Sequence, residues 1–167
     1  MRPALAVIPL LFLCSSLAAQ VRIAVGAAAG QQSYEAHDLG SRFLISPEAQ
    51  VSHDRLAIYY ALDQTNLSSS SLRRGTLHAS HLGVAYQWPL GRNAALSAGA
   101  GPSYISVTYL GGKPAWHAQL ELSLRQQRLE WFTKVRYYDY SLSGFRVASA
   151  SPDGPALLAG VRILLTK

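Results

Sequence analysis

Polar and apolar residues alternate along the stretch WHAQLELSLRQ, from Trp116 to Gln126. Successive side chains of a β-strand point to opposite faces of a sheet, so a period of two predicts a strand with one apolar and one charged face. The pattern leaves open which of these faces points to the interior of the protein. The two faces hold Trp116, Ala118, Leu120, Leu122 and Leu124 on one side, and His117, Gln119, Glu121, Ser123 and Arg125 on the other.

The same period recurs along the rest of the chain after Gln20. Eight alternating runs are separated by residues that form turns, which is typical of an all-β domain. The fifth run changes parity near Gly99–Pro102, and we expect a β-bulge there that keeps Ile105 and Val107 on the apolar face. The predicted strands are Val21–Gly30, Arg42–Val51, Arg55–Asp63, Thr76–Trp88, Asn93–Tyr109, Trp116–Gln126, Leu129–Tyr140 and Ala156–Thr166.

The connections between the runs are alternately short and long. We expect two-residue turns at His53-Asp54 and Gln126-Gln127, and the short segment PLGRN joins the fourth and fifth runs. The other connections are longer and contain Ser, Gly and Pro. The first turn places Val51 opposite Leu56, whereas a slip of one residue would mix apolar with polar positions.

Three features indicate that the apolar face points outward, although a soluble sheet buries that face. The three tryptophans, Trp88, Trp116 and Trp131, lie on the apolar face near strand ends, as the aromatic belts of membrane barrels do. Short turns at one end and long loops at the other are also typical of such barrels. The polar face combines charged residues with Gly and Ala, which suits a narrow lumen.

We therefore expect the apolar face to contact lipid and the polar face to line a lumen. Lipid offers no hydrogen-bond partners to the backbone, so the sheet must close into a barrel. An interior of eight strands is just wide enough to be filled by side chains, which predicts a plugged lumen rather than a pore. Glu121 is expected to lie diagonal to Lys134 and to pair with it. The predicted lumen network comprises Arg22, Glu48, Arg55, Asp63, Glu121, Arg125, Glu130, Lys134, Arg136 and Arg162.

The N-terminal residues MRPALAVIPLLFLCSSLAAQ have the features of a secretory signal peptide. Arg2 precedes a short apolar stretch, which small residues follow. We place the cleavage after Ala19, with Ala18 as the alternative, so that residues 1–19 are the signal and 20–167 the barrel domain. The only cysteine, Cys14, lies within the signal, which excludes disulfides from the mature chain. The chain has a net charge of +6, but its basic residues are scattered, so we expect no nucleic-acid partner.

A signal peptide, eight alternating strands, short turns and four longer loops together resemble the small eight-stranded outer-membrane barrels of the outer membrane protein A and X type. The resemblance implies an eight-stranded antiparallel up-and-down transmembrane β-barrel in the bacterial outer membrane. It implies a monomer with a structural or adhesive role, whose partners are outer-membrane lipids, including lipopolysaccharide, and the barrel assembly machinery. Such barrels usually end in an aromatic residue, and the ending VRILLTK departs from that pattern. A secreted soluble lipocalin-like barrel or β-sandwich is the alternative fold.

The sequence HASH contains the strongest candidate for catalysis, His78 and Ser80. A His-x-Ser pair on the lipid side of a barrel is similar to the dyad of outer-membrane lipid A deacylases, in which the serine attacks an acyl ester and the histidine accepts its proton. The fifth strand has no acidic residue to orient the histidine, and Asp63 has lumen parity. We therefore expect no enzyme activity, cofactor or metal site, with a hydrolase using Ser80 and His78 as the alternative.

Overall fold

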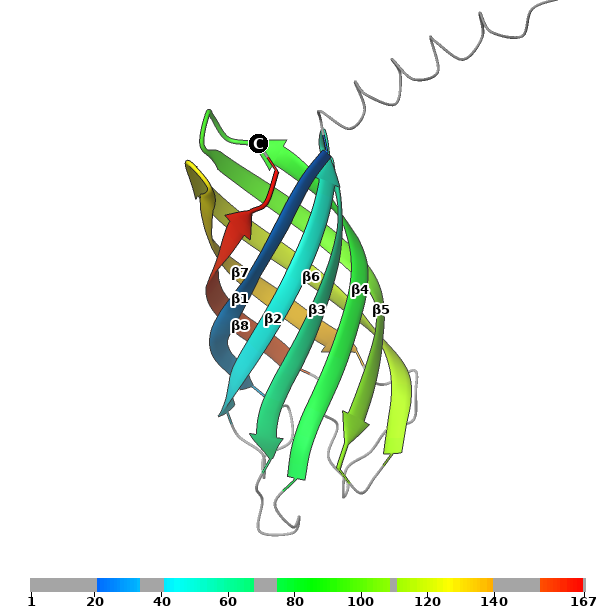
Figure 1. Cartoon of the computed structure of the whole chain (residues 1–167). Helices are drawn as coiled ribbons and strands as arrows, with labels where there is room; N and C mark the ends of the chain where they lie inside the picture. Colours follow the sequence, from blue (N-terminus) through cyan, green and yellow to red (C-terminus); the bar gives the residue numbers. More distant parts are fainter. Residues whose placement is uncertain (1–20, 34–40, 68–74, 109–110, 140–153, 167) are drawn as a thin grey trace, which may run out of the picture.

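The protein forms a closed antiparallel β-barrel in which each strand pairs with its neighbours in the chain, and β8 closes on β1. The computed structural model describes residues 21–33, 41–67, 75–108, 111–139 and 154–166 (Figure 1). The predicted signal peptide with Cys14 lies outside these ranges. The strands are β1 (Val21–Ser33), β2 (Ser41–His53), β3 (Leu56–Leu67), β4 (Gly75–Pro89), β5 (Ala94–Val107), β6 (Gly111–Gln126), β7 (Leu129–Asp139) and β8 (Gly154–Leu164).

The short turns after β2, β4 and β6 lie together at the upper end of Figure 1, which we call the turn end. β1, β3, β5 and β7 end at the opposite side of the barrel, which we call the loop end. The predicted fold class, an all-β eight-stranded antiparallel barrel, is confirmed. In the described part of the chain, no helix is long and apolar enough to cross a membrane.

Both tight turns lie one residue later than the sequence pattern predicted. They are formed by Asp54-Arg55 and Gln127-Arg128, and the first residue of each turn has a left-handed backbone, with φ of 53° and 56°. Aspartate tolerates this conformation better than most residues, which favours the turn at Asp54. Val51 is consequently paired with Ile58 rather than with Leu56. The partner has moved by two residues, so apolar positions still face each other.

The bulge predicted in the fifth strand is absent. β5 keeps one register with β6 from Ala94 to Val107, and its register with β4 is the same on both sides of Pro102. Ile105 and Val107 therefore point into the barrel, where both are buried, and the prediction that they face outward is wrong. A polar lumen was assumed there, but a narrow barrel interior can be packed with apolar side chains as any core is.

The outer surface of the barrel is apolar on all eight strands. Along β6, for example, Leu120, Leu122 and Leu124 are about half exposed, whereas Glu121 between them is buried. An exposed apolar surface that surrounds the strands of the barrel does not fit the soluble alternative, because soluble monomers rarely expose large contiguous apolar patches. Exposed apolar residues from the successive strands include Val25, Ile45, Ile58, Leu82, Tyr104, Leu120, Val135 and Leu157.

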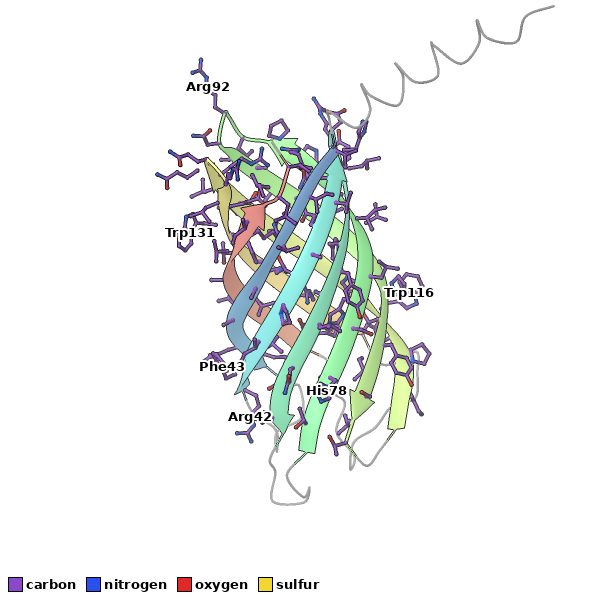
Figure 2. The ribbon with its side chains drawn as sticks, viewed as in Figure 1. Arg42, Phe43, His78, Arg92, Trp116 and Trp131 are labelled. Carbon is purple, nitrogen blue, oxygen red and sulfur yellow. The ribbon has the colours of Figure 1, made fainter. Side chains whose placement is uncertain are left out.

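The three tryptophans all lie on this outer surface, but only two lie near a barrel end. Trp88 precedes the last residue of β4, and Trp131 follows the start of β7, both at the turn end. Trp116 was expected beside a long loop. That placement is wrong, because β6 extends from Trp116 back to Gly111, and Figure 2 shows Trp116 away from both ends.

Candidate functional site in the barrel interior

The interior of the barrel holds two groups of charged side chains. We call the first the turn-side cluster; it lies toward the turn end and consists of Glu48, Glu121, Glu130, Lys134 and Arg162. We call the second the central cluster; it lies next to the first toward the loop end and contains Asp63, His81, Gln119, Arg136 and Tyr138. All ten side chains are buried, so their charges are screened by one another rather than by solvent.

Arg162 of β8 joins the carboxylates of the turn-side cluster. Its Nε donates to Glu48 at 2.5 Å, and its Nη1 donates to Glu121 at 2.7 Å and to Glu130 at 2.9 Å. The guanidinium carbon also lies 4.0 Å from the centre of the Phe132 ring, a cation–π contact. An arginine can satisfy several acceptors in one plane, which offsets the cost of removing these charges from water.

Lys134 pairs with a second carboxylate, Glu48, in addition to the predicted Glu121. Its Nζ donates to Glu48, which reaches across the barrel from β2, while Glu121 lies 3.7 Å away. Because the β6–β7 turn is shifted, Glu121 stands directly opposite Lys134 in the sheet instead of diagonal to it. The predicted Glu121–Lys134 pair is therefore a weaker contact, and Glu121 instead binds Arg162.

The remaining basic residues of the predicted network lie at the turn end. Arg125 is partly exposed and donates to Glu130 at 3.1 Å. Arg22 is of intermediate exposure and donates to the backbone carbonyl of Asp54 at 3.3 Å. The placement of Arg55 in the lumen is wrong, because Arg55 is a residue of the tight turn, where it is exposed and donates to the Tyr86 hydroxyl at 3.2 Å.

The central cluster is built around the carboxylate of Asp63. Arg136 Nη1 donates to both of its oxygens, at 2.8 and 2.9 Å, and the Tyr138 hydroxyl donates to one of them. His81 Nε2 lies 3.2 Å from the same carboxylate. Arg136 also donates from Nε to Gln119 at 3.1 Å. A buried carboxylate with several donors is stabilised as an ion, while Arg136 Nη2 is buried without a hydrogen-bond partner among the described residues.

A chain of hydrogen bonds continues from the central cluster across the interior. His81 Nδ1 and His117 Nδ1 each lie 2.8 Å from the hydroxyl of Ser103, and His117 Nε2 lies 2.7 Å from the hydroxyl of Tyr59. Asp63, His81 and Ser103 thus have the order of groups found in serine hydrolases. Their side chains are enclosed by the barrel wall, with exposures of 2%, 0% and 5%, so a substrate has no access to the serine.

This hydrogen-bond chain was not predicted from the sequence because four strands, β3 to β6, must be in register to assemble it. The lumen parity of His81 and His117 was visible, and so was that of Tyr59. Ser103 was not considered, since the expected bulge placed the parity of that part of β5 in the opposite sense. The sequence signal that could have found it is the run of small residues at every second position, Ser97, Gly99, Gly101 and Ser103, which share one parity.

Toward the loop end, the interior changes from charged to apolar. We call this part the apolar layer; its side chains come from β2, β4, β5, β6 and β8 and are at most 4% exposed. It packs against the ring of Tyr138, whose hydroxyl belongs to the central cluster. The members of the apolar layer are Leu44, Leu77, Ala79, Ile105, Val107, Ala115, Ala156 and Leu158.

Small residues make room for the long interior side chains, as the sequence analysis expected of a narrow lumen. A Cβ atom on Gly83 would overlap the ring of Tyr59, and one on Gly160 would overlap the ring of Phe132. Gly26 is similarly close to Arg162 of the neighbouring strand β8. The interior is therefore filled by an alternation of large and small side chains around the barrel.

The candidate catalytic pair lies on the outer surface near the loop end, where Figure 2 labels His78. Ser80 Oγ donates to the backbone carbonyl of Tyr104 at 3.4 Å. Asp63 lies inside the barrel on Arg136, so it cannot orient His78 as a catalytic acid orients its histidine. Among the described residues, no group of three or more His, Cys, Asp or Glu side chains could hold a metal ion.

No protein-family model matches the chain, and no curated protein matches it in sequence. Solved structures do match. Neisserial surface protein A has 18% sequence identity and a TM-score of 0.60, over 86% of this chain and 96% of that one. Ail, the attachment invasion locus protein of Yersinia pestis, has 11% identity and a TM-score of 0.52, over 87% of this chain and 97% of that one.

A second Ail structure, in complex with the heparin analogue sucrose octasulfate, matches with 12% identity and a TM-score of 0.52, over 87% of this chain and 97% of that one. Neisserial surface protein A and Ail are small eight-stranded outer-membrane β-barrels. Identities this low carry information about the fold and not about a shared activity. The chain therefore has the fold of the small eight-stranded outer-membrane β-barrels, as the resemblance in sequence pattern predicted.

Proposed function

We propose that the protein is a non-enzymatic integral protein of the bacterial outer membrane, with a structural or adhesive role carried by its long connections. The observation that carries this proposal is the reversal of faces, in which exposed apolar side chains surround the barrel while ion pairs fill it. A closed barrel satisfies its backbone hydrogen bonds within the sheet, which is the requirement for spanning lipid with strands. The fold shared with Neisserial surface protein A and Ail supports the same location.

We further propose that the lumen is plugged and conducts no steady ion current. Two barriers in series support this. The turn-side and central clusters pair their charges within the interior, and the apolar layer fills the interior beyond them with Leu44, Leu77 and Leu158. An ion would have to displace both a packed apolar layer and a network of buried ion pairs.

The loop end is the side that we assign to the cell exterior, because long loops of outer-membrane barrels are extracellular. Lys113 is exposed there, and Arg73, Arg74 and Arg146, which lie outside the described residues, fall in the long connections. Basic side chains at this level suit contact with the phosphates of lipopolysaccharide. Adhesion through these connections is in keeping with the fold of Ail, an attachment and invasion protein that has been solved with a heparin analogue.

Membrane fractionation tests the location, combined with gel electrophoresis of unheated and boiled samples. We expect the chain in the outer-membrane fraction, resistant to protease except in its loops, and with different mobility before and after boiling. Recovery of the mature chain as a soluble monomer without detergent would contradict the proposal.

Planar bilayer recording tests the plugged lumen. The purified wild-type protein should give no steady channels, since both barriers are in place. A variant that removes volume from the apolar layer and charge from the network, Leu77→Ala with Glu48→Gln, serves as the comparison. Stable single-channel currents from the wild type would overturn the plugged lumen while leaving the membrane location intact.

A further inference from the structure

A cavity of about 320 Å³ opens at the turn end of the barrel, where the interior meets the two turns that follow β2 and β4. We call it the turn-end cavity. It lies above the turn-side cluster, and Glu130 lines it while also contacting Arg162 below. Arg92, which stands at the upper end of Figure 2, lies on its rim. Its charged lining residues are Arg22, Asp54, Arg55, Arg92, Arg125 and Glu130.

The lining of the turn-end cavity carries more positive than negative charge. Four arginines and two acidic residues contribute to it, which leaves a formal charge of +2. Glu130 offers little further compensation, because its two oxygens already accept hydrogen bonds from Arg162 and Arg125. Asp54 is the other carboxylate of the lining, and it accepts the hydrogen bond from Arg22 with its backbone carbonyl oxygen rather than with its carboxylate.

Two of the arginines have N–H groups that donate no hydrogen bond to the described part of the protein. Arg125 binds Glu130 through Nη2, while its Nε is buried and has no hydrogen-bond partner among the described residues. Arg22 makes one long bond, of 3.3 Å, and it shares the cavity with the like charge of Arg125 as well as with the opposite charges of Glu130 and Asp54. Two guanidinium groups that share a cavity and repel each other are stabilised by an anion placed between them.

We propose that the turn-end cavity binds a phosphate-type oxyanion, with Arg22 and Arg125 as its principal ligands. The planar fork of an arginine matches the oxygens of a phosphate, and two such forks can share one tetrahedral anion. Ser123, Asn93 and Gln87 also line the cavity and supply neutral donors of the kind that accompany arginines around an anion. Arg92 and Arg55 raise the positive potential of the entrance.

The same chemistry has two sources at this end of the barrel, free inorganic phosphate and the phosphodiester of a membrane lipid headgroup. The cavity opens beside Pro89 and Gly91 at the end of the strands, the level at which headgroups meet the barrel. Anion binding in this cavity does not depend on the role proposed for the loops, so the two proposals are tested separately.

Isothermal titration calorimetry of the full chain, folded in zwitterionic detergent, tests the site. Sodium phosphate is titrated at a constant ionic strength set with sodium chloride, so that screening is the same throughout. We expect saturable binding to the wild type and at least a tenfold loss of affinity in Arg22→Gln, or about 1.4 kcal/mol. Arg92→Gln, at the rim, gives a second and smaller loss and needs no interior rearrangement.

The matched control is Arg128→Gln, which removes one positive charge from the exposed β6–β7 turn outside the lining of the cavity, and it should bind phosphate as the wild type does. The gel shift between unheated and boiled samples verifies that each variant is folded. Equal affinity in wild type and Arg22→Gln, equal losses in Arg22→Gln and Arg128→Gln, or no saturable binding by the wild type overturns the proposal.

Bilayer discs identify the source of the anion. The phosphate titration is repeated in discs of phosphatidylcholine and in discs that also contain phosphatidylglycerol. If the headgroup of the anionic lipid is the ligand, phosphate binds more weakly in the second discs because lipid competes for Arg22, and Arg22→Gln removes that difference. If free phosphate is the ligand, its affinity is the same in both discs, and the site stands in either case.

Discussion

The two halves of the barrel interior are equally buried, but the side chains toward the turn end are charged and those of the apolar layer are not. Leu158 and Arg162 lie on the same strand and the same face, and each is 1% exposed. Leu158 packs in the apolar layer, whereas Arg162 binds three carboxylates. Neither half faces bulk water or lipid, so side chains fill its volume and most of its polar groups are paired, with Arg136 Nη2 as an exception among the described residues. Strand parity decides which way a side chain points, but it does not decide whether that side chain is polar.

The stability of the barrel should depend most strongly on the charged half of the interior, where the loss of one side chain leaves others without a partner. Arg162→Ala leaves three buried carboxylates with fewer cations, and we expect a loss of about 3–5 kcal/mol in the free energy of unfolding, measured by denaturant titration of tryptophan fluorescence. Arg128→Ala in the exposed turn is the control, with an effect near zero. If both variants unfold at the same denaturant concentration as the wild type, the network does not hold the interior together.

The apolar half should respond to lost volume rather than to lost charge. Leu77→Ala opens a cavity in the apolar layer, and we expect a cost of about 2–5 kcal/mol. Leu82→Ala on the same strand points outward, where lipid fills the space, so it should cost clearly less. The same unfolding experiment compares them, and a larger cost for Leu82→Ala would mean that inside and outside are assigned the wrong way round.

A charged residue introduced on the outer surface should destabilise the barrel more when it lies deeper in the bilayer. Leu120 lies at the centre of the apolar stripe from Trp116 to Leu124, so Leu120→Arg should destabilise the barrel by about 2–4 kcal/mol in bilayers. Gln126→Arg has the same parity but stands at the turn end, where the expected cost is about 0–1 kcal/mol. Equal costs at the two sites would show that this stripe does not cross a hydrocarbon layer.

The smallest effect is expected at the candidate catalytic pair. Ser80→Ala should leave the release of fatty acids from membrane lipid unchanged, because Asp63 lies inside the barrel and cannot orient His78. Acyl release is measured on wild type and variant in the same lipid, with folding checked by gel shift. An activity that is present in the wild type and lost in a folded Ser80→Ala variant would establish the hydrolase alternative.

The sequence predicted the barrel because alternation is a local property that survives small errors of register. Shifting the turns to Asp54 and Gln127 moved each pairing by two residues, so the faces were unchanged. The turn positions depended on which residue accepts a left-handed backbone, and the pattern of polarity carries no information about that. Arg55 was misplaced for the same reason, since it falls in the turn itself.

The interior site was less predictable because its contacts join strands that are distant in the sequence. Lys134 reaches Glu48 of β2 as well as Glu121 of the neighbouring strand, and the contact across the barrel depends on the diameter and tilt of the closed barrel. The apolar layer was missed because Ile105 and Val107 were assumed to face lipid. In this half of the barrel the polarity of a residue does not indicate its orientation, because apolar side chains such as Ile105 point into the interior.

The most direct test of the reversed faces is the solvent around successive residues of β6. Single cysteines at positions 119 to 124, in a background with Cys14 replaced by serine, are spin-labelled, and the collision rates with oxygen and with a water-soluble nickel complex are measured in bilayers. We predict high oxygen access at Leu120, Leu122 and Leu124, and immobile labels that neither agent reaches at Gln119 and Glu121. Nickel access at the three leucines, with oxygen access at Glu121, would contradict a barrel with lipid outside and a packed network inside.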